Sequence, residues 1–288
     1  MRRDVLTIIV AVTLMPGAFV SGHAQSVDPL KRPTRIDVGG FLYSFSEGSG
    51  EYGPWWGTRL KATNSPPAGM LGATGIFELV TESHRDTGNE SSGVYGAGTA
   101  YYDWNQRVFT LSSIGLGSGD PLLKFNLYNE VDLKLFRGRH VVGLGAGYLD
   151  YHDVNSASYL SFAASYFWTD TFGSPLRVVL QYNYRRYFAE PIHEQTGAHI
   201  LVAGFGAEGR WTRVQYIHGR DLFRAGGDGA PVFDADFDGN VLALQHEESL
   251  TQSYGFTIGL DFVNKSRNGD GRTLFSGPGA EVGFFWNL

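Results

Sequence analysis

Apolar and polar positions alternate strictly along extended stretches of this chain. Between Leu123 and Leu135, the odd-numbered positions are apolar except for Asn129, and the even-numbered positions are polar or amphipathic. A helix would place apolar residues three and four apart, so a period of two indicates a β-strand. Soluble strands usually run for about five or six residues, whereas a segment of this length suits a strand that crosses a membrane at a tilt. Its two contrasting faces predict lipid on one side and a wet lumen on the other.

The same alternation recurs along the chain and predicts an all-β fold, an antiparallel transmembrane β-barrel of about 14 strands. The expected strands begin near residues 34, 54, 69, 93, 107, 122, 140, 156, 176, 199, 211, 240, 251 and 274. The strand near 240 has the weakest pattern, so 12 strands are the alternative. The longest expected connections, such as 220–239, all fall at one end, as outer-membrane barrels with long external loops and short periplasmic turns require.

Both ends of the chain carry features of an exported barrel. Two arginines, an apolar run over 5–20 and small residues at Gly22 and Ala24 predict a signal peptide over 1–24, which leaves a barrel over 25–288. The final strand alternates apolar residues through Trp286 to Leu288. This resembles the signal read by the bacterial barrel-assembly machinery, although phenylalanine is usual at the last position. We therefore expect the outer membrane of a Gram-negative bacterium, with its lipid and lipopolysaccharide as partners.

Tryptophans cluster near the predicted strand ends, where indole favours the membrane–water interface. The expected aromatic girdle comprises Trp55, Trp56, Trp104, Trp168, Trp211 and Trp286. One alternative is the interior of a soluble sandwich, such as a secreted periplasmic lectin. Another is stacking of Tyr52 and the first two tryptophans on sugar rings.

The amino-acid composition excludes several classes of protein. The chain has 39 Gly, 18% charged residues, 42% hydrophobic residues, no Cys and a formal net charge of −6. These values exclude intrinsic disorder, disulfide scaffolds and thiolate chemistry, and the acidic balance argues against nucleic acid as a partner. The mean hydropathy of only −0.16 is the average over the two faces of each strand.

Charged residues on the predicted inner face form the main candidate site. They are Arg59, Lys61, Lys124, Glu130, Asp132, Lys134, Arg177, Arg185 and Arg213. In a barrel of 12 to 14 strands, such side chains either line a narrow pore or pair with one another as a structural ion network. Because both signs are present, they predict no ion selectivity.

One loop carries a candidate cation site. Asp234, Asp236 and Asp238 precede Gly239 with the spacing of a Ca²⁺ loop, but the twelfth position is Gln245 rather than glutamate. A solvated acidic loop and an acidic ladder along a strand are the alternatives. No other cofactor is predicted.

Signals for catalysis are weak. His84, His193 and His199 lie near predicted external regions, but no stretch reproduces the His-x-Ser pattern of outer-membrane lipases and deacylases. Ser83 and His84 are adjacent and should point to opposite faces of a strand. We expect a protein that is not an enzyme, with an outer-membrane hydrolase acting on lipid or lipopolysaccharide as the alternative.

Short motifs in the middle of the chain resemble the YaiO family of outer-membrane β-barrels. They are the strand 130–135, the glycine–tyrosine strand 145–151 with 153–155, and Arg185-Arg186-Tyr187-Phe188. The resemblance covers residues 120–220 and implies a barrel without catalytic residues. It also suggests an association with exported or surface polysaccharide. The expected function is therefore polysaccharide handling or limited passage of small solutes.

Overall fold

The computed structural model describes most of the chain from residue 34 onward. The described segments are 34–45, 47–48, 52–64, 71–84, 88–119, 123–151, 156–168, 176–190, 195–207, 209–219, 223–224, 231–232, 237–267 and 273–288. The predicted signal peptide lies outside them and stays a prediction. Within these segments, no helix is long and apolar enough to span a membrane.

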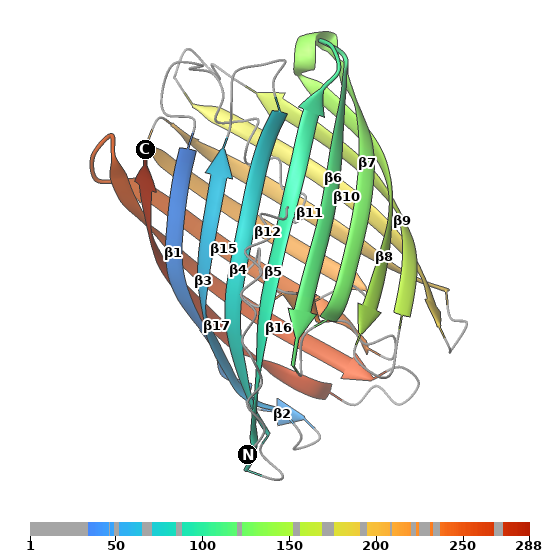
Figure 1. Ribbon diagram of the computed structural model, residues 1–288, viewed down its shortest axis with the longest axis vertical. Coiled ribbons are helices and arrows are strands. Elements are labelled where there is room, and N and C mark those ends of the chain that lie inside the picture. Colours follow the sequence, from blue (N-terminus) through green and yellow to red (C-terminus); the bar gives the residue numbers. More distant parts are fainter. Residues whose placement is uncertain are drawn as a thin grey trace, which may run out of the picture.

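Fourteen described strands of ten or more residues build the molecule (Figure 1). They are β1 (Thr34–Tyr43), β3 (Tyr52–Asn64), β4 (Leu71–His84), β5 (Glu90–Asp103), β6 (Val108–Ser118), β7 (Leu123–Leu135), β8 (His140–Tyr151), β9 (Ser156–Trp168), β10 (Arg177–Glu190), β11 (Gln195–Ala207), β12 (Arg210–Gly219), β15 (Phe237–Ser249), β16 (Tyr254–Arg267) and β17 (Thr273–Asn287). Three two-residue strands, β2 (Glu47–Gly48), β13 (Phe223–Arg224) and β14 (Pro231–Val232), and the 3-10 turn η1 (Phe136–Gly138) complete the described elements.

The sheet closes on itself. Each long strand pairs antiparallel with the next, and β1 pairs with β17, with Arg35 opposite Asn287 and Tyr43 opposite Gly279. The Leu288 amide donates to the Thr34 carbonyl at 2.8 Å at this seam. Closure leaves no unpaired sheet edge, which is the condition for a sheet to lie in lipid. The predicted antiparallel barrel of 14 strands is confirmed, and the alternative of 12 is wrong.

The predicted strand starts lie within four residues of the observed ones. The largest difference is at β11, which begins at Gln195 rather than near 199. The strand with the weakest pattern is real, since β15 pairs with β12 and β16 along most of its length. Main-chain pairing with its neighbours holds this strand in the wall even though its side chains alternate poorly.

The two faces of the wall differ as the alternation predicted. On β7, Val131 and Leu133 are 50% and 47% exposed on the outside, whereas Glu130 and Asp132 are 5% and 3% exposed on the inside. The same exposed apolar belt continues around the barrel, for example at Leu160, Leu201 and Leu260. An apolar outer belt over a polar inner face is the arrangement of a membrane-spanning barrel.

Inward-facing glycines of β8 make room for long side chains from the strands beside it. A Cβ at Gly143 would lie 2.4 Å from an Asp132 oxygen, and one at Gly145 would lie 2.5 Å from the Tyr128 hydroxyl. The glycines therefore let these neighbouring side chains lie flat over the inner wall. This explains the Gly-x-Gly-x-Gly pattern as a packing device.

Two of the six tryptophans lie elsewhere than the predicted girdle. Trp56, Trp104, Trp168 and Trp286 are exposed on the outside, but Trp55 is only 1% exposed and packs edge-on against Phe45 at 5.8 Å. Trp211 also faces inward, because its indole lies against Gly204. Adjacent residues of a strand face opposite sides, so Trp55 and Trp56 never lie on the same face.

Candidate functional site inside the barrel

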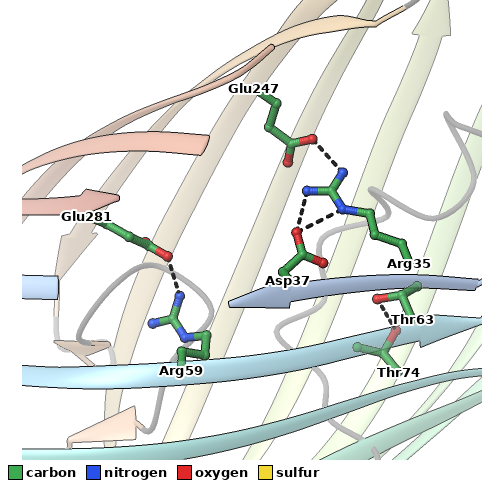
Figure 2. A network of polar contacts seen from close by, with 7 residues as sticks. All are labelled: Arg35, Asp37, Arg59, Thr63, Thr74, Glu247 and Glu281. Carbon is green, nitrogen blue, oxygen red and sulfur yellow. Dashed lines mark hydrogen bonds and ion pairs between the residues drawn. The ribbon is translucent and has the colours of Figure 1, made fainter. Parts of the chain in front are cut away.

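The interior beside the β1–β17 seam holds ion pairs that we call the seam cluster: Arg35, Asp37, Arg59, Glu78, Glu247 and Glu281. Figure 2 shows all of these side chains except Glu78. Arg35 donates from Nε to Asp37 Oδ1 at 2.8 Å and from Nη1 to Glu247 Oε2 at 2.7 Å. Arg35 lies on β1 and Glu247 on β15, with β16 and β17 between them in the sheet. This arginine therefore reaches across the curved inner wall rather than along one strand.

Arg59 forms the second half of the seam cluster. Its Nε lies 2.5 Å from Glu78 on β4, and its Nη1 lies 2.8 Å from Glu281 on β17. Arg59 is 6% exposed and Glu78 is fully buried. A buried charge requires a partner in hydrogen-bonding contact, and here one guanidinium serves two carboxylates.

Further charges surround the cluster. Lys61 and Arg213 both act electrostatically on Glu247. Arg213 and Arg59 act likewise on Asp261, which accepts a hydrogen bond from the Tyr43 hydroxyl at 2.5 Å. Positive and negative groups are thus interleaved over this half of the interior. The arrangement holds strands together that are not neighbours in the sheet.

Tyrosines dominate the wall on the other side of the barrel, over β7 to β10. Tyr128 donates to Glu130 and lies 2.5 Å from the Ser161 hydroxyl. Its ring stacks on Tyr159 with centroids 5.5 Å apart, and the Arg185 guanidinium lies 5.8 Å above the Tyr159 ring. We call Tyr128, Glu130, Tyr159, Ser161 and Arg185 the tyrosine cluster. It combines hydroxyls, ring faces and one cation, the groups that contact sugars and other polyols.

Several buried acceptors on the inner face have no hydrogen-bond partner among the described residues. They are Asn126 Oδ1 and Asp132 Oδ2 on β7, Asn183 Oδ1 on β10 and Gln215 Oε1 on β12. Their side chains are at most 5% exposed. Such orphaned acceptors are rare in folded proteins, and each calls for a donor. These neutral side chains carry no charge, so the charge pattern that predicted the lumen residues does not reveal them.

The nine charged residues predicted to line the lumen have different surroundings. Arg59, Glu130, Asp132 and Arg185 are buried on the inner face, and Lys134 pairs with Asp103 at 2.6 Å. Lys61, Arg177 and Arg213 are partly buried on the same face. Lys124 differs: the register shifts between Leu123 and Phe125, and this lysine is 59% exposed, 3.6 Å from Asp150. A bulge moves it out of the alternation that placed it inside.

The candidate cation loop lies largely outside the described residues. Asp234 and Asp236 belong to an undescribed segment, whereas Asp238 is on β15 with its backbone opposite Ser266. The Ca²⁺ site stays a prediction.

The candidate catalytic histidines do not converge in the described part of the chain. His84 ends β4, and His199 lies on β11, seven strands away in the sheet order. His199 faces outward and lies 2.9 Å from the Tyr182 hydroxyl. His193 lies outside the described residues.

Comparisons with solved structures give the class of the fold. The barrel is similar to the CymD monoaromatic hydrocarbon channel, with a TM-score of 0.56 and 8% identity, covering 93% of each chain. It is also similar to the Acinetobacter baumannii outer membrane protein Omp33, with a TM-score of 0.50 and 10% identity over 90% of this chain and 100% of that one. A bacterial polysaccharide outer membrane secretin matches with a TM-score of 0.50 and 12% identity, over 90% and 99% of the two chains. No curated protein matches the chain.

The fold and its two faces define an integral β-barrel of the bacterial outer membrane. The profile of the YaiO membrane beta barrel domain matches residues 34–188, more than half of the chain, and the chain belongs to this family. The suspected family is confirmed. The match begins earlier than the motifs suggested, because it includes β1 to β6, and it ends at Phe188 on β10.

Proposed function

We propose that this barrel lets small, hydroxyl-rich solutes such as oligosaccharides pass through its lumen, without an enzymatic step. The closed barrel with a polar inner wall carries the proposal, and the inward amides of Asn126, Asn183 and Gln215 lie on three strands of that wall. Solute hydroxyls donate hydrogen bonds to amide oxygens, and a water molecule can readily replace a solute hydroxyl as the donor. A series of such sites lets a polyol move along the wall without a large barrier at any step.

The charged residues of the seam cluster have a structural role in this proposal and do not bind the solute. The two arginines of the seam cluster face four carboxylates, and Lys61 and Arg213 beside the cluster add two positive charges, which brings the charges of this part of the interior close to balance. Compensated pairs hold the wall in shape and produce little net field along the lumen. Neutral solutes are therefore favoured over ions of either sign.

The tyrosine cluster supports carbohydrate as the class of solute. The stacked rings of Tyr128 and Tyr159 lie beside the Ser161 hydroxyl on the inner wall. Two similar barrels are described as a channel and as a polysaccharide secretin, which agrees with passage of solute through this fold. Exported polysaccharide is the longer form of the same chemistry.

Liposome swelling tests the proposal. Vesicles containing the refolded barrel should swell in isotonic mono- and disaccharides, and Gln215→Leu and Asn183→Leu should slow swelling several-fold. Val214→Leu adds a similar side chain one residue away on the outer face and should leave the rate unchanged. Absence of swelling with the wild-type barrel would overturn the proposal. Deacylation of lipid that is lost in His199→Ala would overturn its non-enzymatic part.

A further inference from the structure

A row of polar side chains crosses the outer wall, where most lipid-facing positions are apolar. The backbone registers place Tyr184, His199, His218, Asn240 and Asn264 opposite one another on β10, β11, β12, β15 and β16. We call these five residues the outer polar row. His199, His218 and Asn264 are exposed. Polar groups facing hydrocarbon are costly, so five in one row call for a polar ligand or headgroup.

The row lies toward the outer leaflet. The described turns 104–107, 136–139 and 250–253 lie at the end of the barrel that holds the C-terminus of the chain, and they are short. Short turns mark the periplasmic end of such barrels. His218 is the second-last residue of β12 at the opposite end, and His199 lies near the start of β11 at that same end. Tyr184 lies in the middle of β10, so the row runs from the middle of the wall to the outer ends of the strands, where we expect the phosphate and sugar headgroups of the external leaflet.

Hydrogen bonds fix the orientation of the row. The His218 Nδ1 atom lies 2.9 Å from Asn240 Oδ1, which also accepts from the Tyr216 hydroxyl at 2.6 Å. His199 Nδ1 lies 2.9 Å from the Tyr182 hydroxyl, and its ring lies 5.1 Å from that of Tyr184. The ring nitrogens that point away from these partners are therefore held in defined directions. Preorganised polar groups bind a ligand at low entropic cost.

A cation lies beside the row. Arg186 faces outward from β10, opposite Gly197, and is the diagonal neighbour of His199 on the same face. Tyr184 extends toward Gly197, since a Cβ there would lie 2.9 Å from the tyrosine hydroxyl. In the described part of the barrel, no carboxylate forms an ion pair with His199 or His218. The site is therefore suited to an anion.

An apolar groove of about 510 Å³ runs along the outer wall from Tyr182 and Tyr216, just below the row, to His140 and Tyr166 near the periplasmic ends of β8 and β9. Its lining includes the small residues Ala164, Ala203 and Val214, on β9, β11 and β12. Tyr182 and Tyr216 line its upper part, and their hydroxyls reach the outer polar row. An anionic headgroup site with an apolar groove beneath it has the form of a binding site for one phosphorylated lipid.

We propose that the outer polar row, with Arg186 and the groove, binds lipopolysaccharide through its lipid A part. A lipid A phosphate would contact Arg186 and His199, glucosamine hydroxyls would contact His218 and Asn240, and one acyl chain would lie in the part of the groove next to the row. Lipid A is the phosphorylated sugar lipid of the outer leaflet, so it supplies all three chemistries at this height. The proposal concerns the outer wall and is independent of passage through the lumen.

Binding of purified lipid A to the refolded barrel tests the site. The wild type should retain diphosphorylated lipid A through size-exclusion chromatography. Arg186→Ala/His199→Ala should weaken binding roughly tenfold or more, the effect of losing one charge-assisted hydrogen bond. Ala203→Trp should fill the groove and weaken binding too. Thr81→Ala/Ser92→Ala, an outward polar pair 3.0 Å apart on β4 and β5, should change nothing.

Each outcome decides the proposal, provided that every variant keeps the faster gel mobility of an unboiled, folded barrel. Tighter binding of diphosphorylated lipid A than of its dephosphorylated form supports the phosphate contact. Equal binding of phosphatidylglycerol would overturn the assignment to lipid A. Equal loss of binding in the Thr81→Ala/Ser92→Ala control would mean general lipid contact and would overturn the site.

Discussion

Single buried side chains determine how charge is held inside this barrel. Arg59 is the centre of its ion pairs, whereas Arg210, which pairs with Glu248 at 2.8 Å, is 71% exposed. Burial decides how much each ion pair contributes to the free energy of unfolding, because water screens the exposed pair and is excluded from the buried one. The chemistry of the two pairs is the same, but their effect on stability should differ.

Replacement of Arg59 by leucine should lower the free energy of unfolding by about 3–5 kcal/mol, because the buried Glu78 carboxyl group then loses its partner. Arg210→Leu is the matched control and should cost about 0–1 kcal/mol. Urea unfolding of the refolded barrel, followed by tryptophan fluorescence, measures both. Similar losses in the two variants would contradict a special part for the seam cluster.

The glycines of β8 give a second prediction at this scale. Gly145→Val should destabilise the barrel by about 1–3 kcal/mol, because the added carbons meet Tyr128 and the Ser161 hydroxyl. Gly96→Val on β5 serves as the control, since a Cβ there has nothing within 4 Å. The midpoint of the gel-mobility transition on heating compares the variants, and an unshifted midpoint for Gly145→Val would refute the packing account.

At the scale of the element, alternation predicted nearly every strand, because a lipid face and a lumen face impose a period of two on each one. It did less well where local geometry breaks the period. Lys124 lies at a register shift, and Trp55 and Trp211 turn inward although tryptophan prefers the interface. Strand ends alone do not fix which face a residue occupies; only the phase within the strand does.

The turn between β7 and β8 contains a non-glycine residue with a left-handed backbone conformation. Arg137 has φ of 60° and ψ of 34°, a left-handed conformation that is costly for a residue with a Cβ. Arg137→Gly should therefore stabilise the hairpin by roughly 0.5–1 kcal/mol. Arg139 is right-handed, with φ of −68°, so Arg139→Gly should destabilise it instead. Unfolding midpoints in urea that move in the same direction for both would contradict this reasoning.

At the scale of the whole molecule, closure brings together residues that no sequence pattern connects. Arg35 and Glu247 are 212 residues apart, and their contact depends on the stagger of all the strands around the barrel. The outer polar row likewise forms only when the registers between five neighbouring strands are fixed. The sequence predicted the fold and many inward charges, but their pairing and the orphaned amide acceptors follow from the closed geometry.

Conductance in a planar lipid bilayer tests the central claim, a solute-permeable lumen, most directly. The refolded barrel should give small, steady current steps with weak selectivity between cations and anions, because Lys61 and Arg213 bring the charges in and beside the seam cluster close to balance. Addition of an oligosaccharide should reduce the current reversibly, and less so in Gln215→Leu. A fully folded barrel that inserts into the bilayer and carries no current would contradict the account.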